Sequence, residues 1–179
     1  AEVVGLDPNR PDEMYSLTGQ STIAKTSAEV IEVHLDPPDP PASPSVLEAI
    51  ETSDVLVLGP GSWFTSVMPH LLVPQIVEAI MDSDALKILT LNVAGADETN
   101  GFSPARHLEV LAEHEPRIRF DVVLADRSFA RSDPHLGTFA RNLGARIVEA
   151  DLAMHDGSAR HDPLRLASAY AEVMGVRIR

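Results

Sequence analysis

The sequence predicts an α/β fold in which a Rossmann-like parallel sheet carries helices on both faces. Short, nearly continuous apolar runs such as 54–58 and 121–125 are typical of strands that are buried on both faces. Amphipathic stretches with helix-start signals alternate with these runs, and Ser103-Pro104, a capping residue before a proline, is one such signal. This alternation indicates right-handed crossovers and therefore parallel strands.

Residues 1–45 are predicted to be less regular than the rest. Met14–Thr18 and Val30–Leu35 are predicted strands, the second because its β-branched residues roughly alternate with others. A polar, turn-rich connector, Gly19–Ile23, lies between them. Five prolines within Asp36–Ser45 predict an extended surface crossing without regular structure, with a partner-docking segment as the less favoured alternative.

From Ser45 onward strands and helices alternate, and each helix is placed by its apolar spacing and its start signals. The expected elements are a helix from the cap Ser45 to Glu51, a strand Asp54–Leu58, a helix Pro69–Asp82, a strand Lys87–Val93, a helix Pro104–Glu115, a strand Asp121–Ala125, a helix Pro134–Leu143, a strand Arg146–Glu149 and a helix Pro163–Val173. The series contains no internal repeat, and the proline segment is the only candidate boundary.

The composition excludes several classes of function. A formal net charge of −13 over 179 residues argues against a nucleic-acid partner or an anionic membrane surface, because both attract clustered Lys and Arg. The absence of cysteine excludes disulfides, thiolate metal sites and cysteine nucleophiles. No apolar run approaches the roughly 20 residues that span a bilayer. Ala1–Gly5 does not resemble a signal peptide, so a cytoplasmic location without membrane insertion is expected.

The loop Gly59–Ser66 is the first candidate ligand site. It follows a predicted strand, and ligands of open parallel sheets bind outside the carboxyl ends of the strands. Its glycines allow close approach of the backbone, and its hydroxyl groups and helix-start N–H groups suit a phosphate or carboxylate. A tight strand–helix turn with capping hydroxyls is an equally weighted alternative, since the loop is neither GxGxxG nor a P-loop. The residues expected to contact the ligand are Gly59, Gly61, Ser62, Thr65 and Ser66.

Two further strand ends carry polar side chains. Asn92 stands at the end of the next predicted strand, and Asp97 and Glu98 follow it, where they could bind a metal or act as acid or base. On pattern alone a solvated polar loop is favoured there. Asp126 and Arg127 follow a third strand. Asp126 could accept hydrogen bonds from a ribose or a base, and Arg127 could pair with Asp126 or with a phosphate, but a turn with a surface ion pair is given at least equal weight. The seven histidines are dispersed without an HExxH motif, so no metal site is expected.

The run Leu58–Pro74 closely resembles the signature of the gluconeogenesis factor family of the YvcK type, which belongs with the CofD-like 2-phospho-L-lactate transferases. Glu98–Phe102 resembles the Glu-Thr-x-Gly loop of that family, and Gly19-Gln20 resembles its upstream Gly-Gln motif. One departure is that Ala96-Asp97 stand where the family usually has Pro-Gly.

The resemblance covers nearly the whole chain, from about Met14. It implies that residues 1–179 form the C-terminal part of a single YvcK/CofD-like domain, because the Gly-rich strand–loop–helix with which such proteins begin has no counterpart here. The N-terminal half of the nucleotide site is then expected on a segment absent from this chain. Association with that segment, or a homo-oligomer, is expected.

The resemblance implies a regulatory protein that binds a UDP-sugar, with UDP-N-acetylglucosamine as the leading ligand. It would support cell-wall precursor supply and cell shape during growth on gluconeogenic carbon, without established catalysis. Asn92, Glu98 and Thr99 would line the pocket beside the Gly59–Ser66 loop. The alternative is a CofD-like transferase that moves a phospholactyl group from a nucleotide diphosphate to a deazaflavin and uses magnesium. A third class is an interaction protein acting through its proline segment or its acidic surface.

Overall fold

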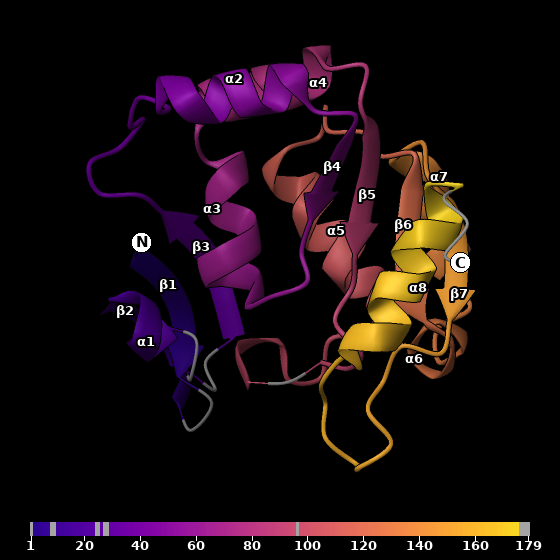
Figure 1. Cartoon of the computed structure of the whole chain (residues 1–179). Helices are drawn as coiled ribbons and strands as arrows, with labels where there is room; N and C mark the ends of the chain where they lie inside the picture. Colours follow the sequence, from indigo (N-terminus) through magenta and orange to yellow (C-terminus); the bar gives the residue numbers. More distant parts are fainter. Residues whose placement is uncertain (1, 8–9, 24–25, 27–28, 96, 176–179) are drawn as a thin grey trace.

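The structure, a computed structural model, describes residues 2–7, 10–23, 26, 29–95 and 97–175 (Figure 1). Within these residues the chain forms two sheets. One is an antiparallel sheet with the strand order β2-β1-β3, and the other is a parallel sheet with the order β4-β5-β6-β7. The parallel sheet and its helices confirm the predicted α/β fold class, whereas the antiparallel sheet is not among the sequence-based predictions.

The antiparallel sheet is formed by the first part of the chain. β1 (Glu2–Asp7) lies in its middle and pairs with β2 (Arg10–Thr18) and β3 (Glu29–His34), which confirms both predicted strands. The connector predicted between those strands instead contains a short helix, α1 (Gln20–Ile23). Ile23 of this helix is fully buried in the core.

The proline segment leads into α2 (Pro44–Thr52). Ser43 takes the N-cap position and Pro44 the first helical turn, so the predicted cap at Ser45 is wrong. Proline suits this position because its fixed φ matches the helix and its missing N–H needs no partner there. Residues 36–43 contain bends without regular structure, as predicted.

The parallel sheet consists of four short strands, and neighbouring strands pair without a register shift. They are β4 (Val55–Leu58), β5 (Leu86–Thr90), β6 (Val122–Asp126) and β7 (Arg146–Ala150). The helices after α2 are α3 (Met68–Leu71), α4 (Pro74–Asp82), α5 (Pro104–His114), α6 (Arg127–Arg131), α7 (Leu136–Asn142) and α8 (Pro163–Val173). Ser103 caps α5 as predicted, and Asp162 caps α8 in the same way, whereas α6 is not predicted from the sequence.

The predicted single helix Pro69–Asp82 is wrong, because the chain breaks before Pro74. A π-helical turn, Trp63–Val67, runs into α3, and α4 begins at Pro74 after a bend of 73°. Proline disfavours the helical conformation of the residue before it. Among the described residues no single helix is long and apolar enough to cross a bilayer. The bent pair formed by Trp63–Leu71 and α4 meets that test only in combination, and most of its first part is buried in the core.

Helices cover both faces of the parallel sheet. α8 lies on one face, where Ala169 packs with Ile88, Val122 and Leu124. α5 and α7 lie on the other face, in a larger core that also includes the Trp63–Leu71 segment and the inner side of the antiparallel sheet. Figure 1 shows α8 in front of the parallel sheet and α5 behind it. The two sheets therefore share one core on the α5 face.

β4 is the end strand of the parallel sheet, and its exposure corrects the prediction that it is buried on both faces. Its residues are only partly buried, and the side chain of Val57 is 46% exposed. By contrast, every residue of the internal strand β6 is buried. The apolar run was read correctly as a strand of a parallel sheet, but its position within the sheet was not visible in the pattern.

Candidate functional site

The Gly59–Ser66 loop leaves the carboxyl end of β4 in a sharp turn that only glycine fits. Gly59 has a φ of +77°, and a Cβ placed on it would lie 2.6 Å from the carbonyl oxygen of Thr90, at the end of the neighbouring strand β5. The peptide bond between Gly59 and Pro60 is cis. The loop backbone therefore lies directly against the end of β5, and the close approach that Gly59 allows is to this strand; the predicted approach of the glycines to a ligand stays a prediction.

Asn92 holds the loop from the side of β5. Its side-chain oxygen accepts a hydrogen bond from the N–H of Gly61 at 3.3 Å, and its side-chain nitrogen donates to the carbonyl oxygen of Gly61 at 3.0 Å. A primary amide can satisfy both polar groups of one peptide residue in this way. Asn92 thus joins two adjacent strand ends, which is the position predicted for it from the sequence.

Glu98 holds the next part of the loop. Its Oε1 accepts hydrogen bonds from the Ser62 hydroxyl at 2.7 Å and from the Trp63 N–H at 2.8 Å, and its side chain is only 6% exposed. Ser62 also bonds to the hydroxyl of Thr65. Because the Ser62 hydroxyl has one proton and gives it to Glu98, the Thr65 hydroxyl is the donor in that second bond.

The segment that carries Glu98 is packed as tightly as the loop it supports. A Cβ added to Gly95 would lie 2.5 Å from the carbonyl oxygen of Thr99 and 2.8 Å from that of Phe102. The 3₁₀ turn Asp97–Thr99 follows directly, and Thr99 is buried within it. Ala96, part of the predicted departure from the family motif, lies outside the described residues. The close backbone packing fixes the position from which Glu98 reaches the loop.

The eight predicted ligand-site residues form one connected region, but they differ in how far they are exposed to a ligand from solvent. Ser66 is exposed, and Gly59, Gly61, Ser62 and Asn92 are partly exposed. Thr65, Glu98 and Thr99 are buried, so in this conformation they support the loop rather than face solvent. Several loop N–H groups are also engaged: that of Trp63 by Glu98, and those of Ser66 and Val67 by the carbonyl oxygen of Ser62. Anion binding by these three amides, expected from the helix start, is not supported.

A histidine that the sequence did not single out lies beneath the loop. The buried ring of His107 packs edge-to-face against Trp63, with centroids 5.0 Å apart, and against Phe102 and Phe129 at 5.4 and 5.9 Å. Its Nδ1 bonds to the carbonyl oxygen of Ser103 at 2.9 Å. Burial lowers the pKa of His107, against the opposing effect of that carbonyl, so the ring is neutral with its proton on Nδ1.

Two buried polar atoms in this aromatic cluster are unpaired. Neither Nε2 of His107 nor Nε1 of Trp63 has a hydrogen-bond partner among the described residues. The signal that could have located His107 is its position on the apolar face of α5, beside Leu108 and Leu111. The cluster forms an uncharged floor for the loop.

The third predicted strand end is structural. The carboxylate of Asp126 is 2% exposed and accepts from the backbone N–H groups of Ser128, Phe129, Leu152 and Ala153 and from the Ser128 hydroxyl. Burial alone would raise the pKa of Asp126, but these hydrogen bonds outweigh it and hold the pKa below its ordinary value. Both of its oxygens are occupied, so the ribose-binding alternative is not supported. A cavity of about 430 Å³ beside it is lined by Asp126, Arg127, Ser128, Arg131, Asp151, Ala153 and His155.

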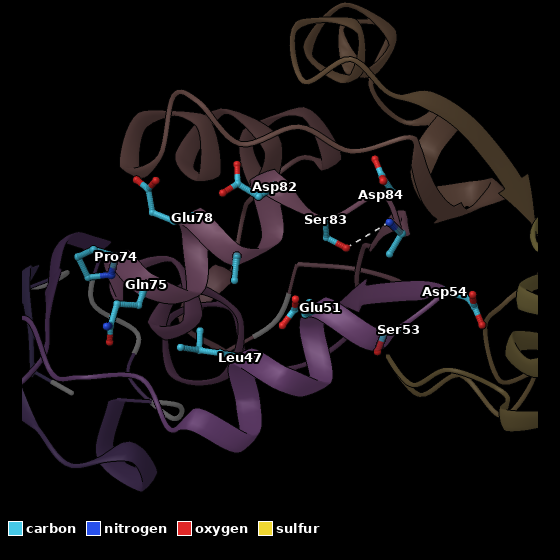
Figure 2. A pocket seen from close by; sticks show the side chains of 12 residues that line it. Leu47, Glu51, Ser53, Asp54, Pro74, Gln75, Glu78, Asp82, Ser83 and Asp84 are labelled. Carbon is cyan, nitrogen blue, oxygen red and sulfur yellow. Dashed lines mark hydrogen bonds between the residues drawn. The ribbon is translucent and has the colours of Figure 1, made fainter.

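A larger cavity lies at the opposite, amino end of the sheet. It has a volume of about 840 Å³ and lies between α2 and α4, with five carboxylate side chains spaced around it (Figure 2). These are Glu51, Asp54, Glu78, Asp82 and Asp84. The negative lining disfavours an anionic ligand. In the described part of the chain no three His, Cys, Asp or Glu side chains converge as a metal site requires.

Comparison with known proteins places the chain in a family. Residues 9–162 match the family model described as 2-phospho-L-lactate transferase CofD. A "Putative gluconeogenesis factor" of Mycobacterium leprae (strain TN) is 41% identical over 182 residues, covering 99% of this chain and 49% of that protein. A protein of the same name from Mycobacterium tuberculosis (strain ATCC 25618 / H37Rv) is 42% identical over 172 residues, covering 94% of this chain and 50% of its own length.

A solved structure gives the same result. The crystal structure of a UPF0052 family member from Bacillus halodurans superposes with a TM-score of 0.73 at 29% identity, covering 94% of this chain and 57% of that one. The chain spans about half the length of the curated relatives that it matches. The match over most of the chain, the parallel sheet and the GPGS loop at the end of β4 agree, and the chain belongs to the YvcK/CofD-like family.

Proposed function

We propose that the Gly59–Ser66 loop forms part of a binding site for a nucleotide sugar, with UDP-N-acetylglucosamine as the expected ligand. The protein would act in the cytoplasm as a regulatory gluconeogenesis factor that supports cell shape and the supply of cell-wall precursors. The observation that carries the proposal is the double support of the loop: Asn92 fixes Gly61, and Glu98 fixes Ser62. Binding groups whose geometry is fixed in advance lose less entropy when a ligand binds.

The chemistry of the open side of the loop suits a sugar hydroxyl better than a bare phosphate. The Ser62 oxygen gives its proton to Glu98 and accepts one hydrogen bond from Thr65, which leaves one lone pair available as an acceptor. The exposed Ser66 hydroxyl can act as a donor. The loop therefore offers an acceptor and a donor within four residues of each other, which is the pairing that a sugar ring requires.

The loop carries no cationic side chain, so it cannot neutralise a diphosphate by itself. Cationic groups from elsewhere would have to supply that part of the binding energy. We therefore expect the 179-residue chain to bind a UDP-sugar weakly. Tight binding by this chain alone would contradict the placement of the site.

The test is an NMR titration of the ¹⁵N-labelled chain with UDP-N-acetylglucosamine, because chemical shifts detect millimolar binding. We expect shift changes at Gly61, Ser62 and Ser66, and we expect Ser66→Asp to abolish them by placing a negative charge beside the ligand. Ser45→Asp changes an exposed serine on α2 in the same way and serves as the control. Shift changes confined to other regions, or none at any concentration with a folded sample, would refute the proposal.

A second candidate function is phospholactate transfer, favoured by the family match over residues 9–162. It would move a phospholactyl group from a nucleotide diphosphate to a deazaflavin. No three His, Cys, Asp or Glu side chains converge among the described residues, so the magnesium that this reaction implies would have to be held by one or two carboxylates together with the substrate phosphates. An assay with a nucleotide-activated phospholactate and a deazaflavin alcohol separates the two functions, since turnover would establish the transferase.

A further inference from the structure

The cavity of about 430 Å³ beside Asp126 lies beyond the carboxyl ends of β6 and β7 and has no part in the proposed function. Its walls come from α6 and from the segment that leads from β7 to α8, and Figure 1 shows α6 beside this segment. In the strand order, β5 lies between this cavity and the Gly59–Ser66 loop at the end of β4. Its volume is within the range of about 300–1,000 Å³ that is typical of small-molecule sites.

The carboxylates that line this cavity already have partners. Asp126 accepts four backbone N–H groups and the Ser128 hydroxyl, so both of its oxygens are engaged. Asp151 forms an ion pair with Arg165 of α8, and its Oδ1 lies 3.4 Å from Nε2 of His155. A cation in the cavity would have to compete with these bonds. The lining is therefore poorly suited to a cationic ligand.

The arginines of the lining are engaged far less. Arg127 forms no hydrogen bond or ion pair within the described part of the chain. Arg131 donates from its Nε to Glu149 at 2.9 Å, and its two terminal nitrogens have no partner among the residues that the structure describes. The two arginines are four residues apart on α6, a spacing that places side chains on the same side of a helix. Two guanidinium groups with free donors therefore lie on one wall of the cavity.

We propose that Arg127 and Arg131 bind the phosphate group of a small phosphate ester, at a site separate from the Gly59–Ser66 loop. A phosphate ester carries a charge of about −1.5 to −2 at pH 7 and three strong acceptor oxygens. Two guanidinium groups match that charge, and each can donate two parallel hydrogen bonds to phosphate oxygens. The rest of the cavity, between α6 and His155 on the opposite wall, accommodates the organic part of the ligand.

The formal net charge of −13 opposes an anion only weakly at this place. Physiological salt screens exposed charges beyond about 8 Å, whereas the two arginines would contact the phosphate directly. The negative charge of Asp151 is offset locally by Arg165. Because Arg127 and Arg131 are both exposed to water, we expect a dissociation constant on the order of 1 mM for inorganic phosphate.

The test is an NMR titration of the ¹⁵N-labelled chain with inorganic phosphate, at an ionic strength held constant with sodium chloride. We expect shift changes in the amides of α6 and of residues 151–155, and none in Gly59–Ser66. Acetate should bind about tenfold more weakly or less, because a carboxylate has one charge and two oxygens. Arg127→Gln should weaken phosphate binding about tenfold or more, because it removes a charge-assisted contact.

Arg146→Gln is the matched control, because Arg146 is an exposed arginine of β7 outside the cavity lining. The ¹⁵N spectrum of each variant shows whether it is folded. Equal weakening by the two substitutions, no shift change in α6 at any phosphate concentration, or acetate binding as tight as phosphate binding would overturn the proposal. Displacement of phosphate from this cavity by UDP-N-acetylglucosamine would make it part of the nucleotide-sugar site and would also overturn it. The proposed function is tested at Gly61, Ser62 and Ser66, so the two proposals can fail separately.

Discussion

The two ends of the parallel sheet differ in a way that decides where to look for a site. At the carboxyl end the Gly59–Ser66 loop is tightly packed, and Asn92 and Glu98 fix it through hydrogen bonds. At the amino end α2 and α4 leave an open cavity of about 840 Å³ surrounded by carboxylates (Figure 2). The cavity of about 840 Å³ and the hydrogen-bonded Gly59–Ser66 loop therefore lie at opposite ends of the sheet.

The comparison shows that the volume of a cavity and the organisation of the polar groups around it are separate properties in this fold. A cavity lined by exposed acidic side chains needs little organised hydrogen bonding, because water can solvate exposed carboxylates, although Glu78 also pairs with Arg117 at 3.1 Å. A buried carboxylate such as Glu98 must have partners, since an unpaired buried charge is strongly destabilising. Buried polar groups at the carboxyl end therefore need partners that exposed groups at the amino end do not. Substitutions at the two ends should differ accordingly in their effect on the free energy of unfolding.

The largest effect is expected at Gly59. Gly59→Ala should destabilise the chain by about 3 kcal/mol or more, because it combines a positive φ with a Cβ 2.6 Å from the Thr90 carbonyl oxygen. Gly157→Ala is the control: Gly157 also has a positive φ, of +82°, but nothing lies within 4 Å of its added Cβ. Urea denaturation should show a loss of only about 1–2 kcal/mol for Gly157→Ala. Equal losses in the two variants would show that the packing of the loop against β5 is wrong.

A smaller effect is expected from Asn92→Ala. It removes both hydrogen bonds to Gly61 and should cost roughly 2 kcal/mol. Amide exchange at Gly61 should become faster, while exchange in the internal strand β6 should follow global stability alone. Asn100→Ala alters an exposed side chain nearby and should change stability by less than about 0.5 kcal/mol. An Asn92 variant as stable as the Asn100 variant would show that the hydrogen bonds from Asn92 to Gly61 do not hold the loop.

The sequence predicted the position of the Gly59–Ser66 loop better than the contacts that hold it. A glycine-rich turn after a strand is a local pattern, so the Gly59–Ser66 loop could be placed from composition and spacing. The bonds that hold it join residues 31 and 36 positions apart, from Asn92 to Gly61 and from Glu98 to Ser62. No local pattern contains that information. The burial of Thr65 and Thr99 follows from the same tertiary contacts.

The fold was likewise predicted where local patterns determine it and missed where tertiary contacts do. Strands of the parallel sheet and the capped starts of α5 and α8 follow from short-range rules. The exposed edge of β4 could not be predicted, because an apolar run has the same periodicity in the middle of a sheet and at its end. The break before Pro74 was missed because the apolar spacing continues through it.

A pH-dependent effect should separate the carboxyl end from the rest of the chain. Burial lowers the pKa of His107 and, at the ends of β5 and β6, that of His161. The folded chain therefore binds fewer protons than the unfolded chain below a pH of about 6.5, so its stability should fall as the pH falls through that value toward the folded pKa values. The expected slope is up to about 1.4 kcal/mol for each pH unit and each histidine.

Urea denaturation between pH 7.5 and 5 measures this slope. His107→Gln keeps a donor for the Ser103 carbonyl but does not titrate. The slope should therefore decrease by up to about 1.4 kcal/mol per pH unit, which is the contribution of one proton. Asp126 acts in a separate window, because its lowered pKa adds stability above its ordinary value of about 3.8, which is lost at lower pH. An unchanged slope in the His107 variant would show that this ring is accessible to protons in the folded chain.

The smallest effect is expected at the acidic cavity of the amino end. Asp82 is exposed and has other carboxylates around it, so Asp82→Asn should change stability by no more than about 0.5 kcal/mol and should tend to raise it by reducing like-charge repulsion. Asp126→Asn makes the same chemical change at the carboxyl end, where the carboxylate accepts from four backbone N–H groups. It replaces one acceptor oxygen by a donor facing those groups, so a loss of about 2–3 kcal/mol is expected. Parallel denaturation curves measure the pair, and a loss at Asp82 as large as that at Asp126 would mean that the amino-end cavity is as highly organised as the carboxyl end of β6.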